Sequence, residues 1–353
     1  FDGMVIKYSQ DGEVEWTKEI GGTNEDTINS VAETTDGGYI VGGYFTSRSI
    51  DLGNGISLTN NGGSDGMVIK YNENGEVEWA KAIGGTSADE ITSVAECNDG
   101  GYVVGGYFYS NSIDLGNGIS LTKKGDSDGM VIKYSKNGDV EWARGIGGSN
   151  EDKITSVAEC SDGSYIIGGY FKSENIYLGS GEKLRKKGSN NASTAGMIIR
   201  YNENGDVEWA RGIGGSNEDQ ITSVVECSDG NYIVGGYFKG DNIDLENDKN
   251  LTNKGDSDGM ILKVTDQWGV PEVQELEVTN SRKEFKIITD VNEIDNIKGG
   301  SISGEDDKPY ETVKYGDSST KEIKMIPDEN YEIIGITVND VDYKFTANDD
   351  GSY

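Results

Sequence analysis

The chain has 353 residues, with 31 basic and 63 acidic side chains, a formal net charge of −32 and no histidine. A surface this acidic repels phosphate backbones and anionic lipid headgroups, so we expect no nucleic-acid binding and no membrane insertion. Without histidine there is no Ser-His-Asp centre, no His-ligated zinc and no histidine pH switch. Glycine is frequent (52 residues) and proline rare (3), which favours short strands joined by tight turns.

One short segment recurs along the chain and defines a repeat. Residues 2–8 read Asp-Gly-Met-Val-Ile-Lys-Tyr, and close copies begin at positions 65, 128, 195 and 258. The intervals are 63, 63, 67 and 63 residues, and the longer one contains an insertion at 189–194. Tryptophan follows the same step, at positions 16, 79, 142 and 209. A fixed period of this kind is typical of a repeat architecture.

Each repeat predicts four short strands. Residues 4–8 and 14–20 alternate with period two and flank Asp11-Gly12, a hairpin signal because glycine accepts the positive φ of such turns. A second hairpin joins residues 28–34 to 39–45. We name the strands of a unit A to D, from the innermost outward; in the first full unit they are 28–34, 39–45, 67–71 and 77–83. Four-stranded antiparallel units at this spacing predict an all-β chain, a β-propeller with one blade per unit.

The run from Lys7 to Gly22 reads K-Y-x-x-x-G-x-V-x-W-x-x-x-x-G-G and resembles the bacterial β-propeller repeat family. The resemblance extends over residues 1 to about 264 and implies a propeller fold and an extracellular setting, without implying one chemistry. Four to five blades are present. Four could close a ring if residues 4–20 completed the last blade, but the strand at 260–264 would then be surplus. We therefore expect part of a larger ring.

The composition changes after residue 268, so we divide the chain into propeller repeats at 1–268 and a second module at 269–353. Strands are expected at 273–279, 285–291, 301–304, 310–315, 322–326, 331–338 and 342–346, which suggests a small β-sandwich or β-grasp. The segments 299–304, 325–331 and 334–339 resemble the divergent internalin-B-type repeat of bacterial surface proteins. That resemblance implies a stalk or spacer, and we expect it to be truncated.

Catalytic motifs are weak. Residues 9–16 resemble the Asp-box of sialidases, but the glycine lies one place too early and the box is structural in that family. A sialidase would also need three convergent arginines, and the chain has only six. A glycosidase needs one pair of carboxyls, whereas Glu15 recurs in every unit, which favours a solvated strand face. We expect no catalytic residue and no enzyme.

The loops before strand A are rich in oxygen ligands, which suit calcium. No EF-hand pattern is present, so loops that cap the next strand are the competing interpretation, and we expect no obligatory cofactor. Three cysteines occupy one position in successive units and are too far apart to form disulfides within a ring. The candidate metal ligands are Asp26, Asp89, Asp152 and Asp219, and the cysteines are Cys97, Cys160 and Cys227.

Loop lengths point to one end of the propeller. The A–B and C–D turns are minimal, whereas the B–C loops run for about 20 residues, so one end carries most of the loop mass and is the expected contact surface. Ile50 and Leu52, with their copies, are instead expected to fold back and cover the blade. The third loop, with its basic run and insertion, is the most distinctive. The candidate binding residues are Arg48, Tyr109, Asn111, Lys172, Glu174, Arg185, Lys186, Lys187, Lys239 and Asp241.

These features predict a non-catalytic, secreted or cell-surface bacterial protein that acts as an adhesin or displays ligands. Its partner would be an extracellular glycan or protein. Two alternatives stay open. One is a carbohydrate-active enzyme or its non-catalytic module, which a carboxylate pair unique to one blade would favour. The other is a structural spacer of a surface assembly, which would self-associate.

Overall fold

The computed structural model describes residues 1–187, 193–239, 242–245 and 250–265, together with short strands between 276 and 343. The chain divides into two compact units, Phe1–Gly269 and Val270–Tyr353. Every regular element in the described residues is a β-strand, which confirms the all-β prediction. Among these residues we find no helix with the length and apolar character needed to span a membrane.

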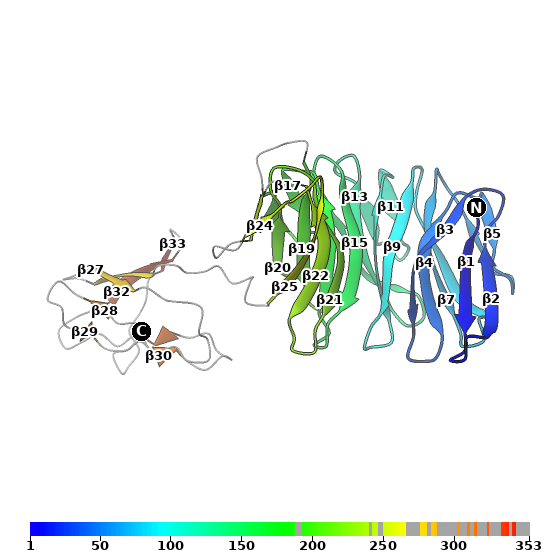
Figure 1. Cartoon of the computed structure of the whole chain (residues 1–353), viewed down its shortest axis with the longest axis horizontal. Coiled ribbons are helices and arrows are strands. Elements are labelled where there is room, and N and C mark those ends of the chain that lie inside the picture. Colours follow the sequence, from blue (N-terminus) through cyan, green and yellow to red (C-terminus); the bar gives the residue numbers. More distant parts are fainter. Residues whose placement is uncertain are drawn as a thin grey trace. The chain divides into compact units, whose positions relative to one another are not determined.

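Three four-stranded antiparallel sheets form the body of the first unit (Figure 1). The first consists of β3 (Asp26–Glu33), β4 (Tyr39–Phe45), β7 (Asp65–Tyr71) and β8 (Val77–Ile83), in that order. These are the predicted strands A to D, so the propeller-blade prediction is confirmed. The second sheet has β9 (Asp89–Glu96), β10 (Tyr102–Phe108), β13 (Asp128–Tyr134) and β14 (Val140–Ile146); the third has β15 (Asp152–Glu159), β16 (Tyr165–Phe171), β19 (Ala195–Tyr201) and β20 (Val207–Ile213).

Two smaller sheets flank these blades. β1 (Gly3–Tyr8) and β2 (Val14–Ile20) form a two-stranded sheet that packs against β3. β21 (Asp219–Glu226), β22 (Tyr232–Phe238) and β25 (Asp258–Val264) form a three-stranded sheet that packs against the third blade. The edge of β22 is therefore taken by β25, and not by the β1–β2 hairpin that the four-blade closure required.

A small hairpin occupies each long B–C loop. In the first blade it pairs β5 (Ser49–Asp51) with β6 (Ser57–Thr59), and β6 packs on β8. Ile50 and Leu58 of this hairpin are buried in the core of the blade, and Leu52 packs partly against it. The prediction that these apolar residues cover the blade is confirmed. The copies are β11 (Ser112–Asp114) with β12 (Ser120–Thr122), β17 (Asn175–Tyr177) with β18 (Lys183–Arg185), and β23 (Asn242–Asp244) with β24 (Asn250–Thr252).

Neighbouring blades touch through glycine on strand B. A Cβ atom at Gly42 would lie 2.6 Å from Cγ1 of Val94, and one at Gly105 would lie 2.5 Å from Cγ1 of Val157. Real carbon atoms do not approach this closely, so only glycine lets the next blade pack here. This requirement accounts for the glycine at 42, 105 and 168, the first residue of a Gly-Gly-Tyr-Phe segment that recurs in the repeat.

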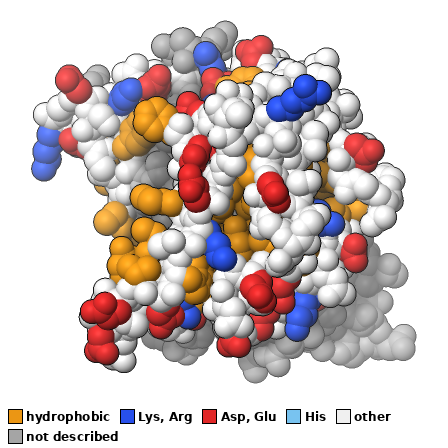
Figure 2. Space-filling model, turned by 90° about the vertical axis from the view of Figure 1, so that its right-hand side faces the viewer, with side chains coloured by type: hydrophobic (Ala, Val, Ile, Leu, Met, Phe, Trp, Pro, Cys, Tyr) orange, Lys and Arg blue, Asp and Glu red, His pale blue; other side chains and the backbone are white. Residues whose placement is uncertain are grey.

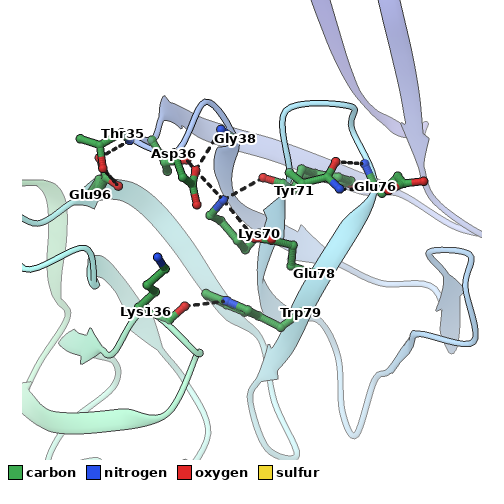
Figure 3. Close-up of polar contacts among 12 residues, drawn as sticks. Thr35, Asp36, Gly38, Lys70, Tyr71, Glu76, Glu78, Trp79, Glu96 and Lys136 are labelled. Atoms are coloured by element: carbon green, nitrogen blue, oxygen red, sulfur yellow. Dashed lines mark hydrogen bonds and ion pairs between the residues drawn. The ribbon is translucent and has the colours of Figure 1, made fainter.

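A buried cation holds the turn end of each blade together (Figure 3). Lys70 is almost completely buried, and its Nζ lies 3.1 Å from carboxylate oxygens of both Asp36 and Glu78 and donates to the carbonyl of Tyr71 at 2.9 Å. The hydroxyl of Thr34, with this ammonium, holds the pKa of Asp36 at about 2. Such an ion needs these partners because burying an unpaired charge is costly. Lys133 and Arg200 take the same place in the next two blades.

The second unit is also built of strands. β26 (Leu276–Asn280) and β32 (Ile333–Val338) lie at the centre of a four-stranded antiparallel sheet, with β27 (Glu284–Ile287) and β33 (Val341–Tyr343) at its edges. Two further pairs are β28 (Ile302–Ser303) with β29 (Pro309–Tyr310), and β30 (Lys314–Tyr315) with β31 (Ile323–Lys324). This unit is the predicted β-rich module.

Candidate functional site

The antiparallel topology places the long B–C loops and the D–A loops at one end of every blade, which we call the loop end. The structure puts most of the predicted binding residues on its surface. Half-buried among them are Tyr109, Lys172 and Lys187; exposed are Arg48, Asn111, Glu174, Arg185 and Lys239. Asp241 and residues 188–192, which include most of the insertion, lie outside the described residues.

Lys186 does not lie on that surface. Its side chain is buried, and Nζ donates to the carbonyl of Lys172 at 3.1 Å and to that of Ser193 at 3.0 Å. Burial lowers the pKa of this ammonium, which carbonyl oxygens stabilise in place of water. The prediction that Lys186 contacts a ligand therefore needs correction, because its buried ammonium joins the two ends of the third loop.

The four aspartates predicted as metal ligands occupy one recurrent, buried position. In Asp89, Oδ2 accepts from the amide of Gly85 at 2.9 Å and the hydroxyl of Ser110 at 2.6 Å. Oδ1 accepts from the amides of Tyr109 and Ser110, both at 3.1 Å. The carboxylate thus ties the D–A loop to the start of the B–C loop.

The same arrangement surrounds Asp26 and Asp152, and Asp219 accepts from the amides of Gly215 and Lys239. N–H and O–H donors face all of these carboxylates, and a cation would have to displace them. Within the described residues, no group of three or more His, Cys, Asp or Glu side chains could hold a metal ion. This geometry favours the capping interpretation over calcium.

The structure reveals a cluster at the loop end that the sequence interpretation missed. The ammonium of Lys153, on β15, lies 4.0 Å from the ring centroid of Tyr107 and 5.4 Å from that of Tyr109, both from the second blade. The two rings meet edge to face, with centroids 6.0 Å apart. Glu151 binds the same ammonium at 2.8 Å. Burial opposes the charge on Lys153, but Glu151, Tyr170 and Tyr109 together outweigh it and raise the pKa of the lysine. We call these four residues the tyrosine–lysine cluster.

Position-by-position comparison of the repeats would have found this cluster. The position of Tyr107 holds a tyrosine in every other unit as well, at 44, 170 and 237. Lys153, in contrast, corresponds to Thr27, Glu90 and Gln220, and Tyr109 corresponds to Thr46, Lys172 and Lys239. The scaffold is therefore shared by all blades, whereas the lysine and the second tyrosine occur together only between the second and third blades.

Several other polar groups considered in the sequence have structural partners. Arg144 donates through Nε to the carbonyl of Gly205 at 2.6 Å and through Nη2 to that of Asn204 at 2.9 Å. Glu78, expected on a solvated strand face, is half exposed but bound to Lys70. All three cysteines are free thiols, as predicted, and Cys97 and Cys160 are buried.

Comparisons with known proteins indicate the class of the repeat but not an activity. No family model matches the chain. A 118-residue stretch, 33% of the chain, is 30% identical to the regulatory protein FlaEY of Caulobacter vibrioides. A 288-residue stretch, 67% of the chain, is 24% identical to the uncharacterized WD repeat-containing protein L264 of Acanthamoeba polyphaga mimivirus. These matches cover only 12% and 21% of the two relatives.

A solved structure of a protein of unknown function from Bacteroides caccae overlaps 83% of the chain and 84% of its own length, at 10% identity and a TM-score of 0.35. The observed blades and the match to a WD repeat-containing protein define the class: the chain is a repeat β-propeller followed by a β-rich unit.

Proposed function

We propose that this chain is a non-catalytic bacterial protein, secreted or displayed at the cell surface, that binds an extracellular glycan or protein through the loop end. The tyrosine–lysine cluster carries this proposal. It lies at the loop end, where the B–C loop of the second blade begins beside the D–A loop of the third. Lys153 and Tyr109 occur at these positions in one blade pair, whereas the residues that hold the blades together recur. A binding site for one ligand needs such a difference between repeats.

The chemistry of the cluster indicates which ligands suit it. Half-buried tyrosine rings offer an apolar face and a hydroxyl, which fit the alternating apolar and hydroxyl surface of a sugar or a protein side chain. Lys153 is already neutralised by Glu151, and the chain carries a net charge of −32. Polyanionic ligands would be repelled, so neutral glycans and basic or neutral protein surfaces are favoured.

The extracellular setting rests on the resemblance of the repeat, and of the segments near residues 299–339, to families of bacterial surface proteins. The stalk role of the second unit is part of the same proposal. Limited proteolysis of intact cells of the source bacterium tests the location. Cleavage of this chain without cell lysis is expected, and protection until lysis would contradict a surface location.

The first experiment measures binding of the purified chain to a panel of neutral glycans and extracellular-matrix proteins, with and without calcium. Tyr109→Thr and Lys153→Thr introduce the residues that the first blade has at these positions, so the fold should tolerate them. We expect each to weaken binding at least tenfold. Gln220→Thr, the same change at the equivalent position of β21, is the matched control and should leave binding unchanged.

Exchange of residues 185–194 for the shorter loop of the second unit tests the third loop separately. Loss of binding in that variant alone would move the site from the tyrosine–lysine cluster to the third loop. If the chain binds none of the panel at high concentration, with or without calcium, the adhesion proposal fails and a structural spacer becomes the better account.

A further inference from the structure

β1 and β25 are copies of one strand, and among the strands that the structure describes each lacks a neighbour that the other copies have. β7, β13 and β19 each lie between a strand B and a strand D. Within the described residues, β1 pairs only with β2, a strand D, and β25 pairs only with β22, a strand B. The unpaired edge of β1 is therefore the edge that would accept a strand B.

The face beside this free edge is apolar and exposed. Met4, Ile6 and Tyr8 of β1 are 71%, 36% and 57% exposed, whereas their copies on β7 are fully buried against the β1–β2 hairpin. Val31 of β3 is 55% exposed, whereas its copy Val94 is 6% exposed because the glycine of the preceding strand B covers it. Figure 2 shows apolar side chains gathered on this side of the molecule.

The last sheet presents the complementary half of the same interface. Among the described residues, a Cβ atom at Gly235 would meet only Cβ of Ser223, at 3.9 Å, although its copies at 42, 105 and 168 receive a valine of the next blade. The hydroxyl of Thr155 donates to the carbonyl of Ile221 in the next sheet at 2.7 Å. Within the described residues, the hydroxyl of its copy Thr222 donates only inside its own sheet, to the carbonyl of Gly235 at 3.4 Å. The β1–β3 side of the first unit thus presents an exposed Val31, and the last sheet presents open space beside Gly235.

We propose that the β1–β2 hairpin of one copy of this chain pairs with β22 of a second copy, in place of that copy's β25. The product is a four-stranded blade, β21–β22–β1–β2, shared between two chains. The register follows from the internal blades and from β25, and sets Tyr232 opposite Tyr8, Ile233 opposite Lys7 and Gly236 opposite Met4. Self-association goes beyond the ligand binding proposed above and does not depend on it.

A second copy is the occupant that the structure favours because this interface already exists inside the chain. The contacts that would form repeat those between the first, second and third blades, residue for residue. The exchange also adds strand D with Trp16, whereas β25 supplies strand C alone in the part of the chain that the structure describes. Burial of Met4, Ile6 and Tyr8 offsets the exposure of Met260, Leu262 and Val264 when β25 leaves, so the net driving force comes from burying Val31 and from the added strand D. Two chains of charge −32 repel each other, so added salt should strengthen the association.

The first test is site-specific cross-linking in about 0.5 M salt, because this ionic strength shortens the range of the charge repulsion between chains. Chains carrying Lys7→Cys are mixed with chains carrying Ile233→Cys under mild oxidation. Opposed residues of an antiparallel pair have Cα atoms about 4.5–5.5 Å apart, which a disulfide can span. We expect a disulfide-linked dimer only in the mixture, and none from either variant alone or from chains with just the three native cysteines. A variant that carries both Lys7→Cys and Ile233→Cys tests closure within one chain. If its disulfide forms at monomer mass, the chain closes on itself and the proposal is overturned.

Sedimentation measurements with two further variants complete the test. Gly235→Ala has room in the isolated chain but would meet Val31 of the second copy, so it should abolish the dimer while leaving the urea unfolding midpoint of the monomer unchanged. Ile261→Glu alters the exposed face of β25, which leaves the interface in the exchange, so it should not weaken the dimer. Loss of the dimer in Ile261→Glu would mean docking on an intact β25 and would overturn the exchange. A purely monomeric parent chain at high concentration and salt would overturn the proposal as well.

Discussion

The indole nitrogen of Trp142 donates a hydrogen bond to the carbonyl oxygen of Glu203 at 3.1 Å, across the boundary between the second and third blades. The ring also meets Tyr165 of the third blade edge to face, with centroids 5.5 Å apart. Trp79 forms the same pair of contacts with Lys136 and Tyr102 one blade earlier. The repeated tryptophan therefore joins one blade to the next through both its ring and its nitrogen.

The first prediction separates these two contributions. Trp142→Phe removes the bond to Glu203, whereas the buried Nε1 of Trp209 has no hydrogen-bond partner within the described residues. Both changes remove similar ring area, so we expect Trp142→Phe to lower the free energy of unfolding by about 1 kcal/mol more than Trp209→Phe does. Urea unfolding of the two variants measures this difference. Equal losses would show that the hydrogen bond contributes nothing.

The second prediction concerns the buried cation of the first blade. Lys70→Met removes the donor to the carbonyl of Tyr71. It also removes the positive charge that pairs with the partly exposed carboxylates of Asp36 and Glu78. Because both carboxylates can regain water, we expect a moderate loss of about 1–3 kcal/mol in the free energy of unfolding. Lys70→Arg should cost less than about 1 kcal/mol, since Arg200 fills this place in the third blade. If Lys70→Arg is as damaging as Lys70→Met, the two cations are not interchangeable here.

The third prediction uses glycine at equivalent positions of strand B. Gly105→Ala places a methyl group against Val157 and Ile154 of the next blade and should destabilise the chain by about 1–3 kcal/mol. The control is Gly235→Ala, the same change at a position where the nearest described atom, Cβ of Ser223, is 3.9 Å away. Thermal and urea unfolding at low protein concentration, where any dimer dissociates, should leave this control close to the parent chain. Equal destabilisation would contradict the packing argument.

The fourth prediction concerns pH. Burial raises the pKa of Asp152 to about 6, despite the donors around it. A carboxyl whose pKa is raised on folding favours the folded state below its unfolded pKa of 3.8, and this contribution is lost as pH rises through 6. Stability should therefore increase as pH falls from 7 to 4.5, with Asp152 contributing at most roughly 3 kcal/mol.

The measurement for Asp152 is the slope of stability against pH in the parent chain and in Asp152→Asn. The variant loses hydrogen bonds and will be less stable overall, but its slope between pH 7 and 4.5 should be smaller. The scan stops at pH 4.5 because carboxyls with a low pKa, such as Asp36, destabilise the fold when they become protonated in more acidic solution. Identical slopes would show that Asp152 does not titrate in this range.

The repeat made most of the fold predictable from sequence. Alternation in residues 14–20 located strand D, which is only partly buried, and the glycine turns located the hairpins, because each turn requires a positive φ. Strand C is buried on both faces in the three complete blades and was located by its repeated sequence. Spacing also located the loop end. The pairing of β25 with β22 was harder, since β1 and β25 have nearly the same sequence and compete for one edge.

The candidate site was less predictable because it depends on contacts between units. Lys153 and Tyr107 are 46 positions apart, and no local pattern links them. The acidic D–A loops suggested metal ligands because sequence shows the oxygens but not the amide donors that face them. Lys186 similarly looked like a surface cation in a basic run, whereas the folded loop turns its ammonium toward carbonyl oxygens.

Because each blade of the first unit packs mainly on the blades beside it in the sequence, the unit is expected to behave as a linear array. In such an array, folding can nucleate in any blade and spread outward, and fraying begins at the termini of the stack. Amide hydrogens in β10 and β16 should then exchange with solvent more slowly than those in β1 and β25. Mechanical extension would remove the outer sheets first and leave the second blade until last.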